Sequence, residues 1–208
     1  MISAFKNLVR VCFPEYFEKK RIKLINAIIG EGAVIYKQAN ISNGNSRESI
    51  SIGDGSHIAG MLLTASKKGR ITIGHHSFVG EGTRIYSVKG VTIGNNVQIA
   101  HNVNIFDNNI HSLDPVERQR EFIINTTRGF IQINDLREKE VIISDNVWIC
   151  AGSFVLKGVT IGENTIVGAG SVVVKDLPAN VIAAGNPAKI IKTLSEQRCS
   201  DPNNVNYD

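Results

Sequence analysis

The strongest constraint on the fold is a six-residue repeat of large aliphatic side chains. An uninterrupted run of it lies in the C-terminal half of the chain: Ile143, Ile149, Val155, Ile161, Val167 and Val173. A small or β-branched residue stands two positions before each of them: Val141, Val147, Ser153, Val159, Thr165 and Ser171. An amphipathic helix repeats about every 3.6 residues and a two-faced strand about every 2. A period of six therefore indicates a short strand and a turn in each repeat, with one aliphatic side chain pointing inward.

The same repeat occurs upstream, between Ile29 and Ile105, with short interruptions. Three hexads make a coil of eighteen residues, and the chain divides into these blocks: 27–44, 50–67, 71–88, 91–108, 141–158 and 159–176. Coils stacked at the inter-strand spacing of ~4.8 Å would build a prism roughly 29 Å tall. Each coil of such a stack pairs its backbone with the coils above and below. We therefore predict an all-β fold, a parallel β-helix of about six coils.

Departures from the repeat divide the chain into regions. Residues 1–26 hold apolar residues among Lys and Arg, interrupted by a proline, and predict a short helical segment. Residues 27–176 form the parallel β-helix, with an extended loop at 112–140 where the six-residue rhythm is lost. We expect residues 177–199 to form a C-terminal segment that ends in a short helix, and residues 200–208 to form a disordered tail.

The N-terminal segment has two interpretations. Its apolar face could cover the open bottom of the prism, where unpaired strand edges need protection. A basic amphipathic segment could instead lie on a membrane surface, so residues 1–25 are also a candidate for peripheral membrane contact. The cap is the preferred interpretation of the two.

Charge and cysteine content exclude several classes of protein. The formal net charge of +4 suits anionic small molecules but is too weak to indicate nucleic-acid binding. The three cysteines are far apart and contain no CxxC pair, which argues against a disulfide framework and for a reducing compartment. No apolar run resembles a signal peptide or reaches transmembrane length. We expect a cytoplasmic protein, at the inner face of the membrane if the N-terminal segment binds lipid.

The five histidines do not form a metal-binding pattern. His101 and His111 are ten residues apart, and neither belongs to a closely spaced H-x4-H pair. His75 and His76 are adjacent in a predicted turn, where their side chains would diverge. A metal site needs several ligands that converge on one ion, with further partners that orient them. We therefore predict no metal site.

His111 is the strongest candidate for chemistry. Its number continues the aliphatic series, yet an imidazole cannot fill an apolar core position without hydrogen-bond partners. The long loop leaves the repeat at this point, and Ile143 can take the core position where the loop returns. Loops of that length in compact domains are usually functional. We expect His111 on the rim beside the loop; the alternative is a surface histidine that begins a loop.

Several motifs resemble those of the hexapeptide-repeat acyltransferases, whose fold is a left-handed parallel β-helix. The stretch His111-Ser-Leu-Asp-Pro-Val-Glu-Arg118 is similar to the one that bears the catalytic histidine in maltose and galactoside O-acetyltransferases. Further matching stretches are Asn146-Val-Trp-Ile149, Gly158-Val-Thr-Ile-Gly162, Gly168-Ala-Gly-Ser171 and Ala184-Gly-Asn-Pro-Ala-Lys189. The resemblance covers roughly residues 27–192 and implies the left-handed winding and transfer of an acetyl group from acetyl-CoA.

On this resemblance, His111 would be the general base that removes the proton of a sugar hydroxyl. A neutral imidazole is well matched to that task near physiological pH. Asp107 and Asp114 are both candidates for the carboxylate that would fix its tautomer. A backbone N–H would stabilise the oxyanion of the intermediate. Cys150 lies in a predicted strand, where we expect it to pack rather than to react.

The same resemblance implies cofactor contacts and an assembly. The predicted acetyl-CoA contacts are Ala151, Ala169, Val174, Lys175, Lys189 and Lys192. The two alanines would let the pantetheine arm approach the prism wall, and the lysines could meet the phosphates. Members of the family act as trimers, which implies a homotrimer in which His111 of one subunit faces the cofactor contacts of the next. No metal cofactor is implied.

The sequence departs from the maltose and galactoside enzymes in features that concern the acceptor. Residues 79–83 lack the asparagine that helps those enzymes to grip substrate and cofactor, and residues 1–25 replace their sugar-binding N-terminal domain. The loop after His111 is also much longer. These departures point toward the related O-acetyltransferases that modify sugars of bacterial surface polysaccharides, such as O-antigen or capsule. The alternatives are an N-acetyltransferase acting on an amino sugar or a small xenobiotic amine, and a non-catalytic β-helix scaffold.

Overall fold

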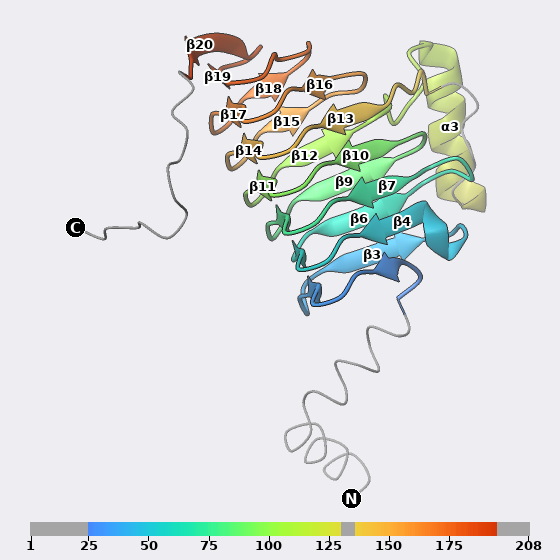
Figure 1. Ribbon diagram of the computed structural model, residues 1–208. Helices are drawn as coiled ribbons and strands as arrows, with labels where there is room; N and C mark the ends of the chain where they lie inside the picture. The colour runs from blue at the N-terminus through green and yellow to red at the C-terminus, as the bar shows by residue number, and fades with distance from the viewer. Residues whose placement is uncertain (1–24, 130–135, 195–208) are drawn as a thin grey trace, which may run out of the picture.

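The chain winds into a stack of short strands that form three sheets (Figure 1). The structure, a computed structural model, describes residues 25–129 and 136–194. Successive turns of the chain each contribute one strand to each sheet. We call these sheets A, B and C, in the order in which the chain first enters them.

Sheet A contains β1 (Ile28–Ile29), β4 (Ile50–Ile52), β7 (Ile71–Ile73), β10 (Val91–Ile93), β13 (Val141–Ile143) and β16 (Thr160–Ile161). Sheet B contains β2 (Val34–Ile35), β5 (His57–Ile58), β8 (Phe78–Val79), β11 (Gln98–Ile99), β14 (Trp148–Ile149), β17 (Ile166–Val167), β19 (Val181–Ala184) and β20 (Lys189–Thr193). Sheet C contains β3 (Asn40–Asn43), β6 (Met61–Thr64), β9 (Arg84–Ser87), β12 (Asn104–Phe106), β15 (Phe154–Val155) and β18 (Val172–Val173). A short 3-10 helix, η1 (Arg47–Ser49), precedes β4.

Neighbouring coils run parallel and in register, so that equivalent residues of the repeat stack. In sheet A, Ile73, Ile93 and Ile143 are partners across β7, β10 and β13, and each is at most 2% exposed. Ile143 therefore takes the core position that the aliphatic series leaves after Ile105, as the sequence predicts. The predicted architecture, mostly β with parallel sheets, is confirmed. The left-handed sense of the winding stays a prediction from the family resemblance.

The small residue of the hexad often carries a hydroxyl that links two coils. The Ser77 hydroxyl donates to the Gly94 carbonyl at 2.9 Å and accepts from the Val97 backbone N–H at 3.0 Å. One coil away, the Ser56 hydroxyl donates to the Gly74 carbonyl and accepts from the Ser77 N–H. Both serines are buried, where polar groups need hydrogen-bond partners. The hydroxyl thus joins backbone groups at a corner of the prism.

One turn position of the coil has a left-handed backbone. The φ angle lies between 52° and 62° at Gly55, His76, Asn96, Asn146 and Asn164. Glycine and asparagine adopt this conformation at little cost, which explains why they recur at the position. His76 occupies the same turn position, so its place in the sequence has a structural role.

The predicted extended loop at 112–140 contains a helix, α3 (Pro115–Arg128). Asp114 caps its first turn by accepting hydrogen bonds from two backbone N–H groups, and the helix ends at Gly129. A capping aspartate followed by proline is a helix start signal, and it lies within residues 112–140, where the sequence predicted an extended loop. The prediction of a loop is therefore wrong for this stretch. Figure 1 shows α3 beside one edge of the stack.

The two ends of the chain are described only in part. The helical segment predicted for residues 1–26 lies almost wholly outside the described residues, so its role as a cap or membrane contact stays a prediction. In residues 177–199 the described part holds β19 and β20, an antiparallel pair at the end of sheet B. The helix expected after Lys192 and the tail at 200–208 fall beyond the described residues, apart from Thr193 in β20. Within the described ranges, no helix is long and apolar enough to span a bilayer.

Two adjacent residues of β11 test which side chains point into the core and which point to solvent. Ile99 is fully buried and Gln98 is exposed. Ile99→Ala should lower the free energy of unfolding by about 2–5 kcal/mol, because it removes buried surface and leaves a cavity. Gln98→Ala should change it by less than about 0.5 kcal/mol. Urea denaturation followed by circular dichroism measures both, and equal losses would contradict the assignment.

Candidate active site

His111 lies outside the core, at the base of the excursion that follows β12. Its side chain is 55% exposed, as expected for a residue on the rim of the prism. Two backbone hydrogen bonds close the excursion below it: the Asn109 N–H donates to the Leu136 carbonyl at 3.0 Å, and the Lys139 N–H donates to the Asp107 carbonyl at 2.8 Å. We call this closed base the neck. The neck fixes the backbone from which His111 projects.

The residue before His111 has a strained backbone. Ile110 has a φ of 64°, in the left-handed region that β-branched residues avoid. The Asn108 side chain holds it there by accepting a hydrogen bond from the Ile110 N–H at 2.7 Å, and the His111 N–H donates to the Asn109 carbonyl at 2.7 Å. Such a conformation costs about 1–3 kcal/mol and is concentrated at functional sites. The strain supports a functional role for this corner of the prism.

Asp107, a predicted partner of His111, has another role. Its carboxylate is fully buried and accepts hydrogen bonds from the Ser87 hydroxyl, the Asn108 amide and the backbone N–H groups of Val88, Lys89 and Gly90, at 2.7–3.1 Å. Those contacts join the neck to the turn after β9. The proposed tautomer-fixing contact between Asp107 and His111 does not occur in the described structure.

The Asp107 charge also affects a neighbouring tyrosine. Burial, and secondarily the negative charge of Asp107, raise the pKa of the Tyr86 hydroxyl above its ordinary value. Tyr86 is on β9 and packs edge-on against Phe106 of β12, with ring centroids 6.3 Å apart. The hydroxyl therefore stays protonated at neutral pH. Tyr86 is therefore not a candidate base.

Asp114, the second predicted partner, is the N-cap of α3. Its carboxylate accepts from the backbone N–H groups of Val116 at 2.8 Å and Glu117 at 3.1 Å. Negative charge at a helix N-terminus is also favoured by the helix dipole. Among the described residues, no hydrogen bond or ion pair links Asp114 to His111, so this prediction too is corrected.

The carboxylate that faces His111 belongs to Glu121, which the sequence analysis did not single out. Its Oε2 atom lies 3.6 Å from His111 Nδ1 and accepts the Ser112 N–H at 3.3 Å. Glu121 is 7% exposed and lies two helical turns after Asp114. The sequence signal for Glu121 is its position two helical turns after the Asp114 cap. That signal has a meaning only if residues 115–128 are recognised as a helix.

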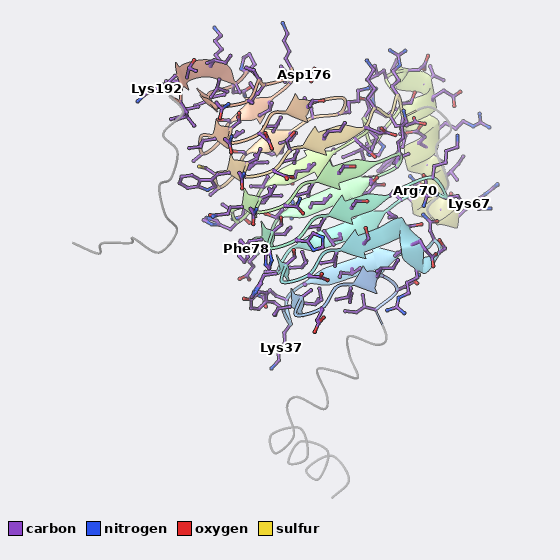
Figure 2. All side chains as sticks on the ribbon, viewed as in Figure 1. Lys37, Lys67, Arg70, Phe78, Asp176 and Lys192 are labelled. Carbon is purple, nitrogen blue, oxygen red and sulfur yellow. The ribbon has the colours of Figure 1, made fainter. Side chains whose placement is uncertain are left out.

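The predicted cofactor contacts lie in three places on one chain. Ala151 and Ala169 occupy stacked turns between sheets B and C, where the Gly170 N–H donates to the Ala151 carbonyl at 2.9 Å. Val174 and Lys175 are exposed after β18, on the same edge as His111 but two coils away. The remaining contacts, Lys189 and Lys192, are exposed on β20. Figure 2 places Lys192 at the corner of the stack opposite α3.

Among the described residues, Cys150, His57 and His75 offer no second centre. Burial raises the pKa of the Cys150 thiol, which disfavours the thiolate needed for nucleophilic attack. His57 contacts the Tyr36 hydroxyl at 3.0 Å, and His75 accepts the Asp54 N–H at 3.1 Å. In residues 25–129 and 136–194, no group of three or more His, Cys, Asp or Glu side chains is placed to hold a metal ion.

Comparisons with known proteins identify the repeat. The family described as bacterial transferase hexapeptide (six repeats) matches residues 140–175. The family described as hexapeptide repeat of succinyl-transferase matches residues 70–106. Both stretches are therefore similar to hexapeptide repeats of bacterial transferases. The family resemblance inferred from the sequence is thus confirmed.

Curated relatives are named acetyltransferases. A putative acetyltransferase of Saccharomyces cerevisiae is 38% identical over 137 residues, which is 66% of this chain and 61% of the relative. The putative colanic acid biosynthesis acetyltransferase WcaF of Escherichia coli is 33% identical over 127 residues, 61% of this chain and 60% of the relative. The galactoside O-acetyltransferase of Escherichia coli is 33% identical over 127 residues, 61% of this chain and 56% of the relative. The chain thus matches about three fifths of the length of these relatives.

A solved structure supports the same fold. A variant of AntD, an N-acyltransferase from Bacillus cereus in complex with dTDP and coenzyme A, matches with a TM-score of 0.62 and 25% identity. The match covers 86% of this chain and 89% of that one. The similarity therefore extends beyond the two stretches matched by the repeat families.

The contrasting roles of the two aspartates can be measured. Asp107→Ala removes a buried acceptor of several N–H groups and should lower the free energy of unfolding by about 3 kcal/mol or more. Asp114→Ala removes only a helix cap and should cost about 1 kcal/mol. Urea denaturation of both variants provides the comparison. Similar losses in the two would show that Asp107 does not join the neck to the turn after β9.

Proposed function

We propose that this protein is an acetyl-CoA-dependent O-acetyltransferase that acts on a sugar hydroxyl, with His111 as the general base. The observation that carries the proposal is the position of His111. An exposed imidazole follows a strained residue at a closed neck, within a hexapeptide-repeat scaffold. A non-catalytic scaffold gives no reason to hold an imidazole in this way.

The proposed reaction needs one proton to move twice. His111 Nε2, the ring nitrogen that does not face Glu121, takes the proton of the acceptor hydroxyl while its oxygen attacks the thioester carbonyl carbon. The resulting tetrahedral oxyanion needs a hydrogen-bond donor, for which a backbone N–H is suitable. Its collapse breaks the carbon–sulfur bond, and the departing CoA thiolate takes the proton back from the imidazolium.

Acetyl-CoA is the proposed donor. The relatives are named acetyltransferases, and the AntD variant is described in complex with coenzyme A. The exposed lysines Lys175, Lys189 and Lys192 could meet its phosphates, while Ala151 and Ala169 present small side chains to the pantetheine arm. Val174, exposed beside Lys175, completes the proposed contact set.

The proposed active form is a homotrimer with a site between adjacent subunits. Within one chain, His111 follows β12 of sheet C, whereas Lys189 and Lys192 lie on β20 at the end of sheet B, so the predicted contacts are spread over the stack. Packing a second copy against the first would bring His111 of one subunit to the cofactor contacts of the next. In this arrangement, the predicted base and all of the predicted acetyl-CoA contacts would belong to one site between two subunits.

The proposed acceptor is a sugar of a bacterial surface polysaccharide. One relative is named for galactoside O-acetylation and another for colanic acid biosynthesis, which favours a carbohydrate hydroxyl. The second candidate is N-acetylation of an amino sugar, which is favoured by the similarity to AntD, an N-acyltransferase. Acetyl-CoA as donor fits a cytoplasmic location.

Replacing His111 tests the proposed base. His111→Ala should lower kcat by about 10²–10⁴-fold, because general-base assistance is lost, while the affinity for acetyl-CoA stays near wild type. Thiol release measures turnover, and isothermal titration calorimetry measures binding. His76→Asn is the matched control, since asparagine suits the left-handed turn that His76 occupies. Wild-type turnover in His111→Ala would overturn the proposal.

The proposed phosphate contacts predict a different kinetic effect. The double variant Lys189→Ala and Lys192→Ala should raise the KM for acetyl-CoA about tenfold or more, because two charge-assisted contacts are removed. Its KM for acetyl-pantetheine, which lacks the nucleotide phosphates, should remain unchanged. An equal rise for both donors would contradict the assignment.

A further inference from the structure

Helix α3 buries a carboxylate and exposes most of its apolar side chains. Val116, Phe122 and Ile123 are 71%, 67% and 52% exposed, whereas Glu121 is 7% exposed and is the helix's buried residue. Glutamate is almost never buried unless a partner compensates its charge. The helix thus places a charged group at the position where a surface helix ordinarily places a hydrophobic one.

The partner of that carboxylate is His111. Glu121 Oε2 lies 3.6 Å from His111 Nδ1 and accepts the Ser112 N–H at 3.3 Å. The neighbouring aspartates cannot take its place, because Asp107 is bonded to the turn after β9 and Asp114 to the first turn of α3. Glu121 is therefore the carboxylate available to the imidazole in the described structure.

We propose that Glu121 is the positioning residue of the general base. Its carboxylate accepts the His111 Nδ1–H, which leaves the lone pair on Nε2 free to take the proton of the acceptor. It also stabilises the imidazolium that forms during attack. At 3.6 Å a small movement of either side chain would form this hydrogen bond, and catalytic contacts commonly tighten when substrates bind. This inference rests on the proposed function and adds a residue to it.

The construction of α3 fits this role. Asp114 caps the helix three residues after His111, so the helix starts close to the imidazole along the chain. Glu121 lies two turns later, and at 3.6 residues per turn it lies on the same face of the helix as the cap. The Arg118 guanidinium donates to the carbonyls of Ser112 and Leu113, which ties the helix back to the segment after His111. As a result, α3 places the Glu121 carboxylate next to His111, at the point where the excursion leaves the β-helix.

Two substitutions at Glu121 and one at Glu117 provide the test. Glu121→Ala should lower kcat about 10–100-fold with no change in the KM for acetyl-CoA, as is typical for loss of a group that orients a functional imidazole. Glu121→Gln keeps an acceptor oxygen without the charge and should retain an intermediate rate. Glu117→Gln, at an exposed site on the same helix that pairs with Arg120 at 3.7 Å, should keep the wild-type rate. Melting temperatures of all three show whether a lost rate reflects lost folding.

A double-mutant cycle separates positioning from a general structural effect. If Glu121 acts through His111, adding Glu121→Ala to His111→Ala should leave the residual rate unchanged. Additive losses, or a kcat of Glu121→Ala equal to that of Glu117→Gln, would overturn the inference. Turnover that survives His111→Ala would instead overturn the proposed function itself.

The tautomer of His111 provides a readout that does not depend on turnover. In the full-length protein, ¹⁵N chemical shifts of the ring should report a protonated Nδ1 and an unprotonated Nε2 above the titration of the imidazole. Glu121→Ala should shift this ratio toward the Nε2–H tautomer, which a free imidazole side chain favours, and Glu117→Gln should leave it unchanged. An unchanged ratio in Glu121→Ala would overturn the inference.

Discussion

The β-helix formed by the described residues depends on hydrogen bonding between successive coils. Its parallel strands are two to four residues long, too short to be stable alone, and each is held by the strands above and below. The aliphatic residues of the hexads stack because those strands are in register. Any insertion must therefore return the chain to the same register, as the excursion after β12 does where β13 pairs with β10.

The neck allows the scaffold to carry a reactive group without losing that register. Asp107 joins the base of the excursion to the turn after β9, and backbone pairs close it. Above this rigid base, strained Ile110 presents His111, and α3 returns Glu121 to the imidazole. Groups that stabilise the fold and groups that we assign to catalysis are thus adjacent in sequence but distinct in role.

The sequence predicted the repeat and the rim position of His111 because both follow from a strict local period. It did not predict Glu121, because the contact depends on a helix whose start was read as part of a loop. Asp107 was chosen for its nearness to His111, yet its contacts are with residues 87–90, a relation that only the stacking of coils creates. The cofactor contacts were predicted from the family resemblance alone. Within one chain they lie in separate places: the turns between sheets B and C, the segment after β18, and β20.

We propose that this protein transfers an acetyl group from acetyl-CoA to a carbohydrate hydroxyl. The most direct measurement incubates the protein with acetyl-CoA and a panel of sugars and amino sugars, and analyses thiol release together with the product by NMR. We expect thiol release that depends on a sugar acceptor, and an O-acetyl ester in the product. Release without an acceptor, no release with any sugar, or an amide as the sole product would contradict it.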